Sequence, residues 1–170
     1  MLTPLTEVLA TCSGAVGSFN VVDLGMGQAI VTAAEELQHP VIIGIATRHW
    51  ESVDGPAIAR GLIAVADRAS VPVAVHRDHA GPDQSDMILE ALNLGFTSIM
   101  IDGSRLPFEE NCRVTEAVMK KAQTYGASVE AELGAIAGEE GVAGLVEGDV
   151  DESMFTDPGK AEKFVKRCPV

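Results

Sequence analysis

The sequence predicts an α/β fold in which parallel strands alternate with helices. Strand-like and helix-like stretches follow one another strictly along the 170 residues. The run Val41–Ala46 is continuously apolar, which is typical of a strand covered on both faces. The stretch 56–69 carries Ile58, Leu62 and Val65 on one side, as expected of a helix that packs against a sheet.

In the first half of the chain, glycine and proline mark the ends of the elements. The first helix stops at Gly14, and the second, rich in Ala and Glu, stops before Pro40. The expected elements are a helix over 4–11, a strand over 15–22, a helix over 28–37, a strand over 41–46, a helix over 56–69 and a strand over 71–76.

In the second half of the chain, glycine and proline again mark the ends of the expected elements. Gly95 and Gly126 follow helix-like stretches, where glycine commonly ends a helix. Pro158 stands in the first turn of the last helix, a position that suits proline. The expected elements are a helix over 85–94, a strand over 97–101, a helix over 107–125, a strand over 127–133, a Gly- and acid-rich loop over 134–153 and a helix over 157–167.

Two architectures combine alternating helices with buried parallel strands: a doubly wound sheet and a (β/α)8 barrel. The dinucleotide-binding form of the first has three glycines after its first strand, but here only Gly25 and Gly27 follow it. A barrel typically needs about 250 residues. We therefore expect residues 1–170 to form a single domain that supplies the first five strand–helix units of a (β/α)8 TIM barrel. A doubly wound nucleotide-binding protein is the less favoured alternative.

The composition argues against two classes of partner. A formal charge of −13 and a pI near 4.5 disfavour nucleic acid and anionic membranes. The three cysteines, Cys12, Cys112 and Cys168, lack zinc-finger spacing and are odd in number, which is typical of a reducing compartment. The chain starts without a basic signal region, and no apolar run reaches membrane-spanning length. We expect a cytoplasmic protein.

The densest group of ionisable residues directly follows strand residues 71–75. It is His76-Arg77-Asp78-His79, at the carboxyl end of a strand, where barrel enzymes build their active sites. Alternation along an extended segment predicts that His76 and Asp78 lie on one side and that Arg77 and His79 lie on the other. Imidazole binds transition metals and carboxylate serves as a base. A polar strand end with one core histidine remains the alternative.

Acidic residues also mark the ends of the next two strands. Asp102 follows the strand over 97–101, and Glu130 and Glu132 lie on one face of the strand over 127–133. Carboxylates in such positions are costly to bury unless they are paired or bind a metal. Three consecutive strand ends therefore favour a common site. Glu139 and Glu140 form either an acidic loop over that site or a solvated turn.

Four segments, in order, resemble the class II aldolase family. VPVAVHRDHA (71–80) resembles the family's motif in which HxDH closes the third strand, and 95–111 is similar to its fourth-strand segment. Residues 129–134, followed by Gly-Glu-Glu at 138–140, resemble its second signature, and 18–21 resembles its first strand. The resemblance extends over about residues 5–167.

This resemblance implies a zinc-dependent barrel enzyme that cleaves or forms a carbon–carbon bond in a fructose- or tagatose-type ketose 1,6-bisphosphate. Asp78 would be the acid/base at the C4 hydroxyl, and Glu140, or its neighbour Glu139, would handle a second proton. The remaining roles that the resemblance implies are metal binding by His79, Asp102 and Glu132, and substrate binding by Asn20 and Ser104. Zn2+ is the implied cofactor, with a second divalent or monovalent cation as a further option. A homodimer or higher homo-oligomer is implied as well.

The sequence also departs from the family pattern. The family's other zinc histidines and its glycine-rich phosphate-binding segments follow later strands, beyond residue 170. Val22, Gly25, Gly27 and 47–50 are atypical, and Ala46 replaces a serine. Ala137 and Gly141 break the family's usual acidic-loop pattern.

These departures affect both substrate and activity. Arg48, His49 and Arg77 either meet an anionic group or are ordinary surface residues, and the second interpretation is slightly favoured. We expect the 170-residue chain alone to be poorly active. The alternative is a non-catalytic or altered-substrate partial barrel that acts as a binding or assembly protein.

Overall fold

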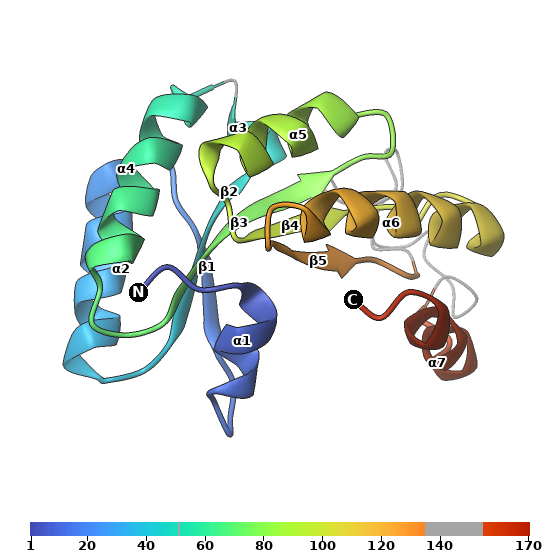
Figure 1. Ribbon diagram of the computed structural model, residues 1–170, viewed down its shortest axis with the longest axis horizontal. Helices are drawn as coiled ribbons and strands as arrows, with labels where there is room; N and C mark the ends of the chain where they lie inside the picture. The colour runs from blue at the N-terminus through green and yellow to red at the C-terminus, as the bar shows by residue number, and fades with distance from the viewer. Residues whose placement is uncertain (51, 135–154) are drawn as a thin grey trace, which may run out of the picture.

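The computed structural model describes residues 1–50, 52–134 and 155–170. It forms one parallel sheet with helices packed around it (Figure 1). The strands are β1 (Gly17–Asn20), β2 (Val41–Ala46), β3 (Val73–Ala80), β4 (Ser98–Ile101) and β5 (Ser128–Ala131). The helices are α1 (Leu5–Ala10), α2 (Leu24–Glu36), α3 (Thr47–Trp50), α4 (Gly55–Arg68), α5 (Ser85–Leu94), α6 (Phe108–Gln123) and α7 (Pro158–Arg167).

The strand order separates the two predicted architectures. All described pairings are parallel and the order is β1-β2-β3-β4-β5, so each strand pairs with its neighbours in sequence. A doubly wound sheet would reverse its order at a switch point, whereas a barrel adds strands in one direction. The described sheet is therefore the start of a barrel, as the sequence predicts. Its two edges are β1 and β5.

One face of the sheet forms the main hydrophobic core. Alternate residues of the strands, among them Ile43, Val75 and Ile99, pack against α2, α4, α5 and α6. The opposite face carries polar side chains from the same strands, which hydrogen-bond to one another across the sheet. This division follows from the two-residue period of a strand and leaves the polar face for chemistry.

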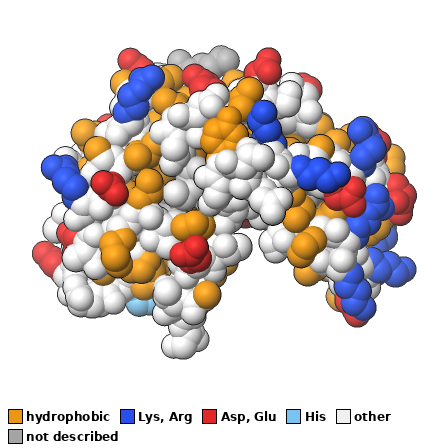
Figure 2. Space-filling view, viewed as in Figure 1, with side chains coloured by type: hydrophobic (Ala, Val, Ile, Leu, Met, Phe, Trp, Pro, Cys, Tyr) orange, Lys and Arg blue, Asp and Glu red, His pale blue; other side chains and the backbone are white. Residues whose placement is uncertain are grey.

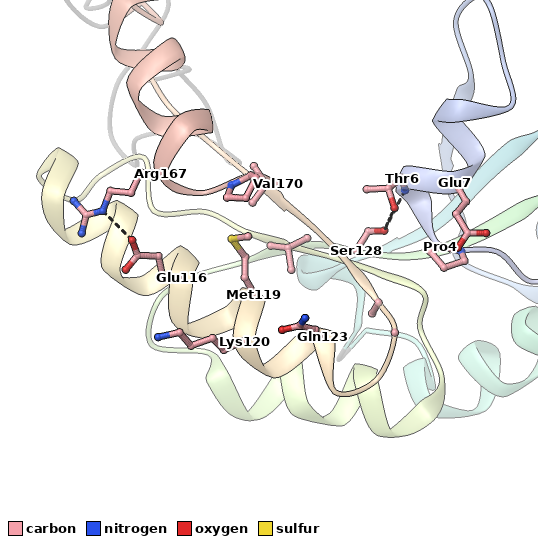
Figure 3. A pocket seen from close by; sticks show the side chains of 14 residues that line it. Pro4, Thr6, Glu7, Glu116, Met119, Lys120, Gln123, Ser128, Arg167 and Val170 are labelled. Carbon is pink, nitrogen blue, oxygen red and sulfur yellow. Dashed lines mark hydrogen bonds and ion pairs between the residues drawn. The ribbon is translucent and has the colours of Figure 1, made fainter.

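Helix α1 covers the amino end of the polar face. Its Leu5 and Val8 are buried against Ile42 of β2 and Ala74 of β3. The Thr6 hydroxyl lies 3.0 Å from the Ser128 hydroxyl at the start of β5. A cavity of about 500 Å3 opens beside this contact and extends to α6 and α7 (Figure 3).

The sequence predicts most of these elements to within a few residues, with two differences. The four-residue helix α3 was not expected, and β3 runs to Ala80 instead of ending at His76. Asp78 and His79 therefore lie within β3 and not after it. No helix among the described ranges is long and apolar enough to cross a membrane.

Candidate metal and acid–base site

The end of β3 brings Asp78 and His79 together. His79 has a positive φ of 52°, and the register between β3 and β4 shifts between Arg77 and Ala80. His79 Nδ1 consequently lies 2.9 Å from Asp78 Oδ1. The prediction from strict alternation, which placed these two side chains on opposite sides, is wrong because the backbone leaves the extended conformation at His79.

Three strand ends supply a group of possible metal ligands. One ligand atom each from His79, Asp102 and Glu132 lies within 4.8 Å of the other two, the one such group found among the described residues. His79 Nε2 faces Glu132 Oε2 at 3.4 Å, while its Nδ1 is held by Asp78. One imidazole and two carboxylates form a donor set that suits Zn2+. Metal-binding histidines are usually oriented by a hydrogen bond from the ring nitrogen that does not bind the metal, often to a carboxylate, as Nδ1 of His79 is here by Asp78.

Other residues fix the two carboxylates. Asp102 Oδ1 accepts hydrogen bonds from the Ser104 backbone N–H at 2.9 Å and the Ser104 hydroxyl at 2.6 Å. Buried Asn111 of α6 donates to the Glu132 backbone oxygen at 2.8 Å and accepts from Thr115. These contacts hold the loops after β4 and β5 beside His79.

The pKa values of Asp78 and His79 show how strongly they interact. Hydrogen bonds to Asp78 and then to Glu132 raise the pKa of His79 to about 10. Burial acts to raise the pKa of Asp78, but hydrogen bonds from His79 and Asn20 outweigh it and lower the pKa to about 2. The carboxylates thus favour a positive charge at His79, and a metal cation bound there would displace its proton.

His76, the other histidine of β3, differs from His79 in its protonation. His76 Nδ1 lies 2.8 Å from the Ser98 hydroxyl, and its Nε2 lies 3.6 Å from Glu130 Oε2. Burial lowers the pKa of His76 to about 4, so the ring is neutral at neutral pH. Burial and then Asp78 raise the pKa of Glu130.

The chain is similar to known proteins in both sequence and structure. The family model described as "Fructose-bisphosphate aldolase class-II" matches residues 4–170. The chain belongs to the class II fructose-bisphosphate aldolase family. The fructose-bisphosphate aldolase of Thermus caldophilus is 43% identical over 153 residues, which are 89% of this chain and 48% of that protein. The crystal structure of the YdjI aldolase from Escherichia coli K12 superposes with a TM-score of 0.81 at 29% identity, covering 99% of this chain and 60% of that one.

The relatives of this chain carry more than one named activity. The 6-phospho-5-dehydro-2-deoxy-D-gluconate aldolase of Halalkalibacterium halodurans is 41% identical over 145 residues, 82% of this chain and 50% of that protein. The chain thus spans about half the length of the curated relatives that it matches.

The residues that the sequence assigned to this aldolase site are only partly accounted for. The structure brings Asp78, His79, Asp102 and Glu132 together, whereas Glu140 lies outside the described residues, as does Glu139. The two residues expected to bind substrate contact other site residues here. Asn20 donates to Asp78 Oδ2 at 2.6 Å, and Ser104 donates to Asp102.

One sequence interpretation is corrected by the packing. Arg77 is not a surface residue, because its side chain is fully buried and its guanidinium carbon lies 4.1 Å from the centre of the Trp50 ring. It also donates to the Ile45 backbone oxygen at 3.3 Å. Arg77 therefore joins β3 to α3 behind the site.

Sequence reasoning did not assign roles to Asn111 or Ser98. A buried asparagine in an otherwise amphipathic helix is a signal for Asn111, because a buried amide requires partners. Ser98 offers no comparable signal, since its partner His76 lies 22 residues away.

Proposed function

We propose that this chain carries the metal-binding and acid–base end of a zinc-dependent ketose-bisphosphate aldolase. The reaction is cleavage or formation of the C3–C4 bond of a fructose- or tagatose-type 1,6-bisphosphate, giving dihydroxyacetone phosphate and an aldehyde phosphate. One observation carries the proposal: His79, Asp102 and Glu132 converge to within 4.8 Å beside Asp78. Family membership supports it, since class II aldolases are zinc-dependent.

His79 Nε2 and the carboxylates of Asp102 and Glu132 would hold the metal. Zinc supplies Lewis-acid polarisation of the substrate ketone when it is bound. The protein's own part is orientation: Asp78 holds His79 through Nδ1, and Ser104 holds the Asp102 carboxylate. These contacts leave the Nε2 side of the imidazole facing the carboxylates.

Asp78 is the proposed acid/base for the C4 hydroxyl. Its carboxylate is ionised at neutral pH, and Asn20 fixes its second oxygen at 2.6 Å. Glu140, with Glu139 as the alternative, is the proposed carrier of a second proton. Asn20 and Ser104 are proposed to contact substrate in addition to their observed partners.

The 170-residue chain is proposed to cleave substrate slowly. It is also proposed to form a homo-oligomer and to be located in the cytoplasm. The chain spans about half the length of these curated relatives. A second candidate is a partial barrel that serves in binding or assembly. Among the residues that the structure describes, β1 and β5 lie at the edges of the sheet, where a further strand can pair.

The test is an assay of the purified chain with fructose and tagatose 1,6-bisphosphate, with zinc and with a chelator. Slow release of dihydroxyacetone phosphate that depends on zinc is expected. Turnover at the usual enzymatic rate of about 10 per second would contradict the slow-chain proposal. Cleavage that persists in chelator would contradict the zinc assignment, and absence of cleavage with zinc would favour the assembly role.

A further inference from the structure

A cavity of about 550 Å3 adjoins the metal and acid–base site at the carboxyl end of the sheet. Its lining includes His79 and Asp102, together with Arg48 of α3 and Arg105 of the β4–α6 loop. Its size falls within the usual range of small-molecule sites. A substrate bound at the metal cluster could therefore extend into a space that two arginines share.

The distribution of positive charge makes this pair unusual. The chain has 12 Lys and Arg against 25 Asp and Glu, and 135–154 contains no Lys, Arg or His. Apart from buried Arg77, the other basic residues belong to α4, α6 and α7, and many gather over α6 and α7 (Figure 2). Arg48 and Arg105 are therefore the exposed basic residues that line this cavity in an acidic protein.

The backbone around the cavity adds to the positive potential. The amino end of α5 borders it, and Gln84, the N-cap residue, makes no side-chain cap bond to that helix. The Gln84 side chain instead accepts from the Gly81 N–H at 2.7 Å. Helix amino ends attract anions because their first N–H groups lack partners within the helix.

Two carboxylates in the cavity and one in the helix oppose an anion. Asp102 is one of the possible metal ligands, so a bound divalent cation would offset its charge. Asp83 lines the cavity and Asp86 lies in the first turn of α5. The cavity is therefore expected to bind anions more tightly when the metal cluster is loaded.

The rest of the lining offers few other groups for recognition. Ala46 presents only a methyl group, and the Thr47 hydroxyl already donates to the Asp78 backbone oxygen at 3.1 Å. The planar, multiply donating guanidinium groups of Arg48 and Arg105 suit phosphate oxygens.

We infer that Arg48 and Arg105 determine specificity by binding the terminal phosphate of the aldehyde half of the substrate. This inference rests on the proposed aldolase function and adds to it the residues that bind the terminal phosphate of the substrate. A phosphate dianion matches two guanidinium groups and a helix amino end better than a neutral sugar end does.

The direct test is binding of glycerol 3-phosphate to the zinc-loaded chain. Binding is monitored through the NMR signals of the Arg48 and Arg105 Nε–H groups. Both signals should shift, and Arg48→Met and Arg105→Met should each weaken binding at least about tenfold. Arg60→Met is the matched control, because Arg60 is exposed on α4, and it should leave the affinity unchanged. Unchanged affinity in the first two variants, or glycerate binding as tightly as glycerol 3-phosphate, would overturn the inference.

A cleavage assay separates this inference from the proposed function. Arg48→Met and Arg105→Met should lower kcat/KM about tenfold or more for a ketose 1,6-bisphosphate, but little for the corresponding ketose 1-phosphate. Equal losses on the two substrates would contradict the inference while leaving the aldolase function standing. Phosphate binding at the arginines without any cleavage would support the anion site and contradict the aldolase function.

Discussion

The two ends of the same sheet have different chemistry. At the amino end, α1 buries Leu5 and Val8 against the strands. At the carboxyl end, ionisable groups from three strand ends converge. Parallel strands bring residues as distant in sequence as Asp78 and Glu132 together at their carboxyl ends. A site can therefore form there, while the amino ends contribute packing. The contrast predicts that changes at the carboxyl end alter chemistry and changes at the amino end alter stability.

The largest expected effect is at Asp78. Asp78→Asn keeps the shape of the side chain but removes the proposed base, so cleavage should slow by about 10²–10⁴-fold. Release of dihydroxyacetone phosphate under single-turnover conditions measures this. Asp67→Asn, an exposed change on α4, is the control and should cleave normally. Normal cleavage by Asp78→Asn would show that another group moves the proton.

At the amino end, Leu5→Ala should destabilise the fold without changing metal binding. Leu5 is 8% exposed and packs in the small cluster under α1. Removing a buried leucine side chain should cost about 2–3 kcal/mol. Urea unfolding measures the loss, and zinc titration of the folded variant is the comparison. Leu9→Ala, on the exposed side of the same helix, should cost far less, because Leu9 is 51% exposed. Equal losses from the two changes would contradict the packing role of α1.

A smaller effect is expected at Ser104. Ser104→Ala removes the hydroxyl that orients Asp102 at 2.6 Å while leaving the backbone N–H bond. Loss of such an outer contact typically weakens metal affinity about tenfold. Zinc titration with a competing chelator measures the change, and Ser70→Ala on the α4–β3 connection is the control. Unchanged affinity in Ser104→Ala would remove Asp102 from the metal site.

The subtlest effect is the opposite titration of two histidines in the metal-free chain. The raised pKa of His79 gives stability that is fully present below about pH 6.5 and is lost as the pH rises through about 10. The lowered pKa of His76 means that the unfolded state binds a proton first, so stability falls as the pH drops from about 6.5 through about 4. NMR titration of the two imidazoles checks this. Titration of both near pH 6.5 would contradict the geometry.

The sequence is sufficient for the strands, the long helices and the edge at which the site forms. Apolar runs and glycine ends are local signals, and the family motif extends over the residues that converge. The turn of His79 toward Asp78 could not be predicted, because it depends on a positive φ that the local pattern does not show. The burial of Arg77 depends on Trp50, which lies 27 positions earlier in the sequence and stacks on it only in the folded sheet.

The central claim is that the carboxyl end of the sheet holds a divalent metal beside Asp78. Anomalous diffraction at the zinc edge, from crystals of the chain grown with Zn2+, tests it most directly. The account predicts a peak about 2.0–2.2 Å from His79 Nε2 and from a carboxylate oxygen of Asp102 or Glu132. A zinc peak found instead between Cys12 and His39, whose Sγ and Nε2 lie 3.4 Å apart, or no peak at His79, would contradict it.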